Sequence, residues 1–332
     1  MSIKALITAI GSLSSHIVLR TLSRMGWATV GCDIYPQEWL AEGRSVQTFY
    51  RAPLGNNATY MPFLLDVVQK EEPQYVLPLT DIEVDVLSGH RADIEKAGAV
   101  LCLPSANTVS LCRNKLLFHK KLQELGLRCT IPTYTSKEME DDSLWRQAET
   151  WIGKPVNGRS SEGLRRISSR EQFLRILSDI DAGNYIFQPC IGDETSHVVT
   201  VDIIRQSEYG LFAAMPRREL LRTINGAGTT VEIFENEKLT VLCKRIADIL
   251  DIRGCVNFEF IEEGEQYYIL ECNPRFSGGV EFSCLSGYDF VENHLRCFFG
   301  ERIDEFPKEY TQQIMTRRHN VVVTKRKDGM GQ

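Results

Sequence analysis

The sequence predicts a mixed α/β and α+β fold, in which an N-terminal domain with a doubly wound parallel sheet precedes a second, larger part. The chain has 332 residues, enough for two domains of about 150 residues each. Over the first hundred residues, short apolar runs alternate with amphipathic stretches, as strands and helices do around a parallel sheet. After residue 250, two segments of alternating apolar and polar residues flank a turn, which is typical of an antiparallel hairpin.

In chain order, the first domain is predicted to contain strands at 3–9, 29–33 and 75–79 and helices at 14–25, 58–70 and 84–96. The first strand leads into a turn at Gly11, which is similar to a nucleotide-binding turn but lacks the second and third glycines of G-x-G-x-x-G. Asp33 closes the second strand, where a ribose-binding acid lies in a dinucleotide fold. Because the glycines are missing, we interpret Asp33 as a polar residue at a strand end.

Next, a single helix is predicted over 104–126, with Asn107 as N-cap and Gly126 just past the C-terminal end. Lys115 lies on the apolar stripe of this helix, which by itself favours a lysine that packs at the edge of the core. A strand at 151–155 then ends in Lys154 and runs into a loop rich in Gly and Ser over 157–163. Such a loop offers a cation, hydroxyls and unhindered backbone N–H groups to a phosphate chain, although a plain hairpin loop has the same composition.

A further strand is predicted at 185–189, and the basic, Gly-rich segment 217–230 is either a lid over an anionic site or a long surface hairpin. In the hairpin after residue 250, a three-residue turn at 263–265 would pair Phe258 with Leu270 and place Glu259 diagonally beside Glu271 on the other face. Asn273 would share that face.

Two carboxylates on one face of a sheet repel each other unless a cation lies between them. Carboxylate and amide oxygens are suited to Mg²⁺. The alternative is a pair of acidic strands that face solvent. Arg275 follows Asn273 by two residues and precedes Gly278 and Gly279, so a permanent cation and a turn open to substrate come next in the chain.

Together these motifs resemble those of ATP-grasp enzymes, most closely the branch of the carbamoyl-phosphate synthase large chain and single-chain amino-acid ligases. The resemblance covers about residues 105–300 and is most specific in the run from Glu271 to Gly279. It implies an N-terminal pre-ATP-grasp domain (1–105), a small lobe with a phosphate loop (106–190), and a large lobe with the Mg²⁺ site and the C-terminal tail (191–332). Gly153 and Gln188 depart from the family pattern, because an apolar residue and a glutamate are usual at these positions.

The resemblance also implies residue roles. The ATP-binding residues would be Lys115 and Lys154 at the phosphates, Ser160, Ser161 and Gly163 in the loop above them, Gln188, Cys190 and Ile191 at adenine, and Glu194 at the ribose. The ligands of two Mg²⁺ ions, for which Mn²⁺ is an expected substitute, would be Glu259, Glu271 and Asn273. Arg275 and Lys154 would be catalytic, Arg275 by stabilising an acyl phosphate.

The implied activity is that of an ATP-dependent carboxylate–amine ligase, which forms an amide or peptide bond through an acyl phosphate and releases ADP and phosphate. Amino acids or other small carboxylic acids would be its substrates, and a homodimer is expected by analogy. Two alternatives stay open: an ATP-binding module without catalysis, and, less favoured, a nicotinamide-dependent oxidoreductase built on the first hundred residues.

Composition limits the partners and the compartment. The apolar share of 43% and charged share of 25% are ordinary globular values. A net charge of -6 gives no general reason to expect a nucleic acid as partner. The first apolar stretch, 5–10, is too short to span a membrane and has no cleavage site after it. The ten cysteines contain no C-x-x-C pair and the histidines no H-x-x-x-H pair, so we expect a cytoplasmic protein with reduced thiols, no His/Cys metal site and no membrane partner.

Overall fold

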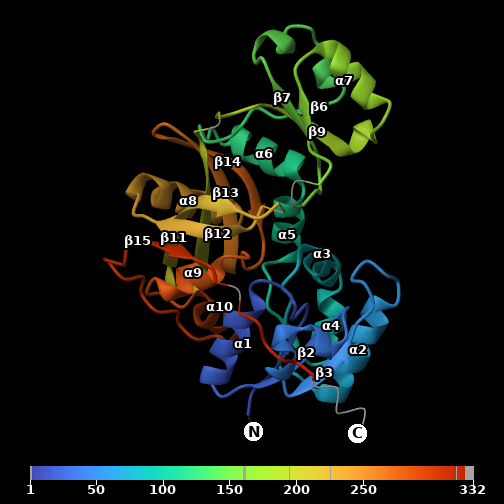
Figure 1. Cartoon of the computed structure of the whole chain (residues 1–332), viewed down its shortest axis with the longest axis vertical. Helices are drawn as coiled ribbons and strands as arrows, with labels where there is room; N and C mark the ends of the chain where they lie inside the picture. Colours follow the sequence, from blue (N-terminus) through green and yellow to red (C-terminus); the bar gives the residue numbers. More distant parts are fainter. Residues whose placement is uncertain (1, 160–161, 194, 225, 319, 326–332) are drawn as a thin grey trace, which may run out of the picture.

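The computed structural model describes residues 2–159, 162–193, 195–224, 226–318 and 320–325. Figure 1 shows the N-terminal domain at the bottom, a large sheet above it and a small lobe at the top. Within the described residues, no helix combines the length and the apolar character that crossing a membrane requires. The cysteines are free thiols, and all except Cys190 and Cys284 are buried.

A five-stranded parallel sheet forms the core of the N-terminal domain, in the order β3-β2-β1-β4-β5. Its strands are β1 (Lys4–Ile7), β2 (Ala28–Asp33), β3 (Thr48–Arg51), β4 (Tyr75–Leu77) and β5 (Val100–Leu101). The helices of this part are α1 (Ser15–Arg24), α2 (Tyr60–Glu71), α3 (Asp81–Gly89) and α4 (Arg91–Lys96). The parallel sheet is as predicted, whereas the helix expected over 84–96 is two helices that meet at His90.

The apolar side chains of this sheet contribute to two buried clusters. Leu6, Val30 and Val76 pack in one cluster with side chains from the helices α2, α3 and α4. Ile7 and Leu77 belong to the other cluster, which also contains side chains from α1 and from α10 (Phe290–Phe299). Because this second cluster continues into the large sheet, the N-terminal domain is packed directly against the part that carries the acidic hairpin.

The helix predicted over 104–126 is wrong as a single element, because the structure has α5 (Ala106–Arg113) and α6 (Lys115–Glu124) instead. The side chain of Ser105, and not that of Asn107, caps α5. Asn114 adopts an extended conformation between the helices and caps α6, in a position where asparagine is strongly preferred. Gly126, with φ +68, follows the end of α6 as predicted. As a result, Lys115 begins a helix instead of lying in the middle of one.

The small lobe is built on a four-stranded antiparallel sheet, in the order β6-β9-β7-β8. Its elements are β6 (Tyr134–Thr135), β7 (Trp151–Pro155), β8 (Arg165–Ile167), α7 (Arg170–Leu177) and β9 (Tyr185–Pro189). The strands predicted at 151–155 and 185–189 are therefore confirmed. A Cβ atom at Gly153 would lie 3.0 Å from the Phe187 ring, so close packing of this ring explains why glycine replaces the usual apolar residue.

The large sheet has six strands, in the order β14-β13-β10-β11-β12-β15, and is antiparallel throughout. The strands are β10 (His197–Gln206), β11 (Leu211–Arg222), β12 (Gly228–Ile233), β13 (Gly254–Glu263), β14 (Gln266–Asn273) and β15 (Gln313–Thr316). The helix α8 (Glu237–Ile249) packs on one face, and α10 packs on the other, with α9 (Val280–Leu285) beside it. The segment 217–230 belongs to the β11–β12 hairpin, and the alternative of a lid over an anionic site stays a prediction.

Short 3₁₀ helices complete the structure and lie in connections between these elements. They are Gln37–Trp39, Ala41–Arg44, Glu138–Glu140, Leu144–Arg146, Ala182–Asn184 and Ser207–Tyr209.

The predicted register of the acidic hairpin is wrong at its turn. Glu263 pairs with Gln266, so the turn has two residues instead of three. The register then shifts between Phe260, which pairs with Ile269, and Glu259, which pairs with Glu271. This β-bulge at residue 270 returns the two carboxylates to one face, where they lie directly opposite each other instead of diagonally.

Candidate functional site

A single cavity of ≈ 630 Å³ receives side chains from the N-terminal domain, the small lobe and the large sheet. It brings together most of the residues that the sequence analysis singled out: Lys115, Lys154, Gln188, Cys190, Ile191, Glu259, Glu271, Asn273 and Arg275. The loop glycine Gly163 does not line the cavity, although its neighbours Glu162 and Leu164 do. The predicted residues Ser160, Ser161 and Glu194 lie outside the described residues.

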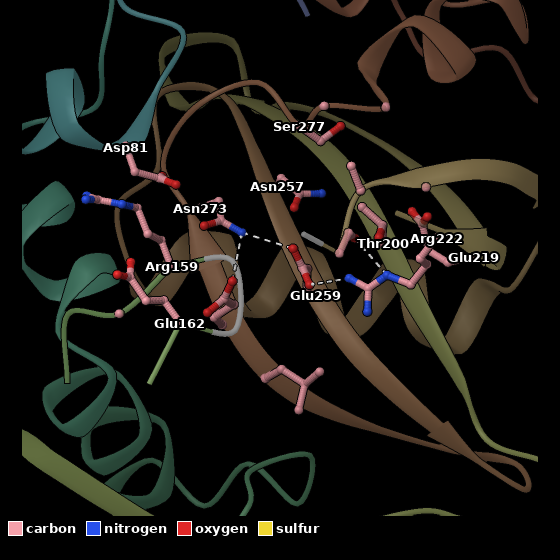
Figure 2. A pocket seen from close by; sticks show the side chains of 18 of the residues that line it. Asp81, Arg159, Glu162, Thr200, Glu219, Arg222, Asn257, Glu259, Asn273 and Ser277 are labelled. Atoms are coloured by element: carbon pink, nitrogen blue, oxygen red, sulfur yellow. Dashed lines mark hydrogen bonds and ion pairs between the residues drawn. The ribbon is translucent and has the colours of Figure 1, made fainter. Parts of the chain in front are cut away.

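The side-chain amide of Asn273 bridges the carboxylates of Glu259 on β13 and Glu271 on β14. The side-chain nitrogen of Asn273 lies 3.3 Å from an oxygen of Glu259 and 3.2 Å from one of Glu271 (Figure 2). Burial, together with the neighbouring Glu271, raises the pKa of Glu259 to about 7. An ionised Glu259 is therefore costly in the protein alone, and a divalent cation between the carboxylates would remove that cost.

Two lysines approach this pair from the side of the small lobe. Lys115 is buried, lies 3.1 Å from a Glu271 oxygen, and donates a hydrogen bond to the carbonyl of Gly158 at 2.6 Å. Burial raises the pKa of Glu271, but Lys115 and Lys154 hold it below the usual range of a glutamate. Burial and then the nearby Lys115 lower the pKa of Lys154 to about 8. An anion in the cavity would therefore stabilise the charged form of Lys154.

Arg275 is oriented by a residue of the N-terminal domain. Its guanidinium forms a two-pronged ion pair with Asp81 at 2.8 and 2.7 Å and donates to the carbonyl of Phe276. Burial raises the pKa of Asp81, but Arg275, together with Arg113 and Lys115, more than offsets this effect and keeps the pKa below its usual range. Asp81 was not predicted from the sequence. Its position just after the predicted strand 75–79 was the available signal, because ligands bind at the carboxyl ends of parallel strands.

Part of the cavity lining is apolar. Ile131, Ile152 and Ile261 line the cavity together with the predicted adenine-binding residues Gln188, Cys190 and Ile191. Gln188 is buried, and its side-chain nitrogen donates to the Thr133 hydroxyl at 2.7 Å. Such a slot, apolar with a few fixed polar groups, is suited to a flat aromatic ring.

In the turn after β1, Ser12 and Ser14 line the cavity, whereas Asp33 does not. Asp33 accepts hydrogen bonds from the backbone N–H groups of Gly11 at 2.9 Å and Tyr35 at 3.0 Å. Its carboxylate therefore stabilises the turn itself, in agreement with the interpretation of Asp33 as a polar residue at a strand end.

Comparisons with known proteins identify the fold to which this site belongs. A family model described as "ATP-grasp in the biosynthetic pathway with Ter operon" matches residues 193–322. The chain contains an ATP-grasp domain. It is 23% identical over 282 residues to the arginine-specific carbamoyl phosphate synthase large chain of Bacillus subtilis, a match that covers 80% of this chain and 26% of that one. It is also 22% identical over 265 residues to the carbamoyl phosphate synthase large chain of Clostridium acetobutylicum, a match that covers 74% of this chain and 24% of that one.

Solved structures with the same fold include a biotin carboxylase from Campylobacter jejuni in complex with β,γ-ATP. It superposes with a TM-score of 0.79 at 16% identity and covers 95% of this chain and 76% of that one. N5-carboxyaminoimidazole synthetase from Staphylococcus aureus, complexed with ADP, gives a TM-score of 0.72 at 12% identity, with 95% and 81% covered. The chain spans about a quarter of the length of the curated relatives.

The ATP-grasp domain also contains a buried polar network that the sequence analysis missed. Arg217, fully buried on β11, forms an ion pair with Asp202 and donates hydrogen bonds to the hydroxyls of Ser283 and Ser277, the latter at 3.0 Å. Ser277 belongs to the turn after Arg275, so the network fixes the floor of the cavity. The sequence offered Arg217 only as part of a basic segment, because its partners come from other strands and from α9.

Proposed function

We propose that this chain is an ATP-dependent carboxylate–amine ligase, a carbon–nitrogen bond-forming enzyme that works through an acyl-phosphate intermediate and releases ADP and phosphate. One observation supports this most: the acidic residues Glu259 and Glu271, together with Asn273, line the same cavity as Lys115 and Lys154. The two carboxylates repel each other, as do the two lysines, and a complex of a divalent cation with a nucleotide would offset the free-energy cost of this repulsion.

In this proposal, Lys115 and Lys154 bind the phosphate groups of ATP. Glu259, Glu271 and Asn273 provide the oxygen donors for two Mg²⁺ ions, or for Mn²⁺ in their place. When bound, these ions neutralise charge on the transferred phosphoryl group. The side chains contribute orientation, since phosphoryl transfer depends mainly on positioning and charge neutralisation.

The adenine ring would occupy the apolar slot beside Gln188, Cys190 and Ile191. The roles of Ser160, Ser161 and Gly163 above the phosphates, and of Glu194 at the ribose, remain predictions.

Arg275 would stabilise the acyl phosphate and the oxyanion that forms when the amine attacks. Asp81 fixes the guanidinium in one orientation, which is the condition for stabilising a developing charge without reorganisation. A second domain thereby participates in the reaction.

The proposed organisation is a doubly wound pre-ATP-grasp domain at 1–105, a small lobe at 106–190 and a large lobe at 191–332. Small-molecule carboxylates and amines, with amino acids first among them, are the proposed substrates, and a cytoplasmic homodimer remains a prediction by analogy.

The test is a screen for ADP release over pairs of the twenty common amino acids, with ATP and Mg²⁺ present and the products identified by mass spectrometry. Hydroxylamine added in place of the amine traps an acyl phosphate as a hydroxamate. The Glu271→Gln variant should release no ADP above background. ATP binding without ADP release in any mixture would favour the alternative of an ATP-binding module without catalysis.

A further inference from the structure

One buried carboxylate in the cavity has no role in the proposed nucleotide site. Glu219, on β11, is 7% exposed and lines the cavity. Its Oε2 atom has no hydrogen-bond partner among the described residues. A buried charged acceptor without a partner costs folding free energy, so a natural protein that keeps one needs an explanation.

The terminal nitrogens of the neighbouring guanidinium groups are engaged elsewhere, and the Nε atom of Arg217 has no hydrogen-bond partner among the described residues. The terminal nitrogens of Arg217 donate to Asp202, Ser283 and Ser277. Arg222 donates to the carbonyl of Gly226 at 2.7 Å and lies 3.5 Å from Glu259. Neither arginine donates a hydrogen bond to Glu219 within the part of the chain that the structure describes.

The fold reserves space for the Glu219 carboxylate. Gly228 begins β12 next to it, and a Cβ atom at this position would lie 1.7 Å from Oε2 of Glu219. Any other residue at position 228 would therefore displace the carboxylate. Burial raises the pKa of Glu219, and the field of Arg217 offsets part of that rise.

Glu219 lies apart from the acidic pair but on the same face of the sheet. Thr200 on β10 pairs with both Arg217 and Glu259, and β10 separates β11 from β13. Two strand spacings put the backbones of Glu219 and Glu259 on the order of 10 Å apart. In Figure 2, Glu219 and Asn273 lie on opposite sides of Glu259. Both carboxylates line the same cavity, so a small molecule bound there can contact Glu219 and lie beside the proposed Mg²⁺ site.

We propose that Glu219 binds the ammonium group of the amine substrate. This inference rests on the proposed ligase function and adds the location and the charge of its second substrate. An ammonium group carries only hydrogen-bond donors, and Glu219 offers an acceptor that lacks one. The proposal therefore predicts a preference for amine substrates that arrive as cations.

The first test separates the two half-reactions in wild type and in the Glu219→Gln variant. For the most active pair from the amino-acid screen, the KM for the amine should rise at least about tenfold in the variant, as expected for the loss of a charge-assisted hydrogen bond. Trapping with hydroxylamine, which is largely uncharged at pH 8, should proceed at the wild-type rate. An unchanged KM for the amine, or a higher Mg²⁺ requirement for trapping, would overturn the assignment.

A second test needs no turnover and so does not depend on the ligase function. Saturation-transfer NMR with MgADP present compares the binding of propylammonium and of uncharged 1-propanol. Wild type should bind propylammonium at least about tenfold more tightly, and Glu219→Gln should lose the preference. Equal binding of the two probes by wild type would contradict the proposal, even if the enzyme proves to be a ligase.

Two further variants test whether the loss of the preference is specific to the Glu219 carboxylate. Gly228→Ala should lose the same preference, because its methyl group would displace the carboxylate. Glu232→Gln is the matched control, since Glu232 lies on the neighbouring strand β12, is paired with Arg218 and does not line the cavity. It should behave as wild type. Loss of the preference in Glu232→Gln as well would show that the effect is not specific to the site.

Discussion

Replacing Glu259 by glutamine should stabilise the metal-free protein while it abolishes turnover. Burial and the neighbouring Glu271 raise the pKa of Glu259 to about 7, from an ordinary value of 4.5. Because the folded-state pKa is the higher one, stability is fully present below pH 4.5 and is lost as the pH rises to about 7. A shift of this size corresponds to about 3 kcal/mol at pH 8, the cost that a neutral glutamine avoids.

The measurement is thermal unfolding at pH 8 in EDTA, followed by tryptophan fluorescence. A gain of about 3 kcal/mol should raise the melting temperature of Glu259→Gln by roughly 5 °C or more, and the gap should shrink toward pH 5. Glu262→Gln on the same strand is the matched control with the opposite sign. Its carboxylate accepts hydrogen bonds from Arg218, which hold its pKa below the usual value, so this variant should melt below wild type.

With MgATP added, wild type should have a higher melting temperature than Glu259→Gln. Wild type gains binding energy from the nucleotide, whereas Glu259→Gln has lost a metal ligand and gains less. Melting of Glu259→Gln below wild type in EDTA at pH 8 would refute the reasoning that an uncompensated acidic pair is kept for a cation.

Lys154→Met should weaken ATP binding about tenfold or more by calorimetry, whereas Lys120→Met, on the exposed side of α6, should bind as wild type; equal affinities would remove Lys154 from the phosphate site. Arg275→Lys should fail in turnover because an ammonium group cannot reproduce the two-pronged pair with Asp81, and near-normal turnover would contradict this. Burial lowers the pKa of His294 to about 3, so stability should be full above pH 6.5 and fall by about 2 kcal/mol by pH 5; an equally steep loss in His294→Gln would show that other groups cause it.

The parts of the fold that depend on local patterns were predictable. The parallel sheet follows from the alternation of apolar runs and amphipathic stretches. Its strands β1 and β4 fall within the predicted ranges, and β2 begins one residue before its predicted range. The helix break at Asn114 was harder to predict, because the apolar periodicity continues across it. An asparagine within such a pattern does not by itself show a break. The break is accompanied by the cap that the Asn114 side chain forms on α6 and by the hydrogen bond from the backbone of Lys115 to Val156.

The site was predictable where its residues are close in sequence or match a family motif, and not where partners are distant. Asp81 and Arg275 are 194 positions apart, and nothing in either local sequence indicates the other. Arg217 was predicted only as part of the basic segment 217–230, because its counter-ion, Asp202, comes from the neighbouring strand. Glu219 was not predicted as a site residue because a glutamate in a basic hairpin is expected to be exposed, and the sequence does not indicate that it is buried.

The bulge at Leu270 shows how the helix α6 controls the proposed metal site. With the observed two-residue turn and no bulge, Glu271 would pair with Phe258 and point into the apolar cluster under α8. The ring of His119 on α6 donates to the carbonyl of Leu270 at 3.2 Å and is kept neutral by burial, which lowers its pKa to about 3. Lys115, at the start of the same helix, pairs with the Glu271 carboxylate. One helix therefore fixes both the backbone irregularity that turns Glu271 toward the cavity and the charge that keeps it ionised there.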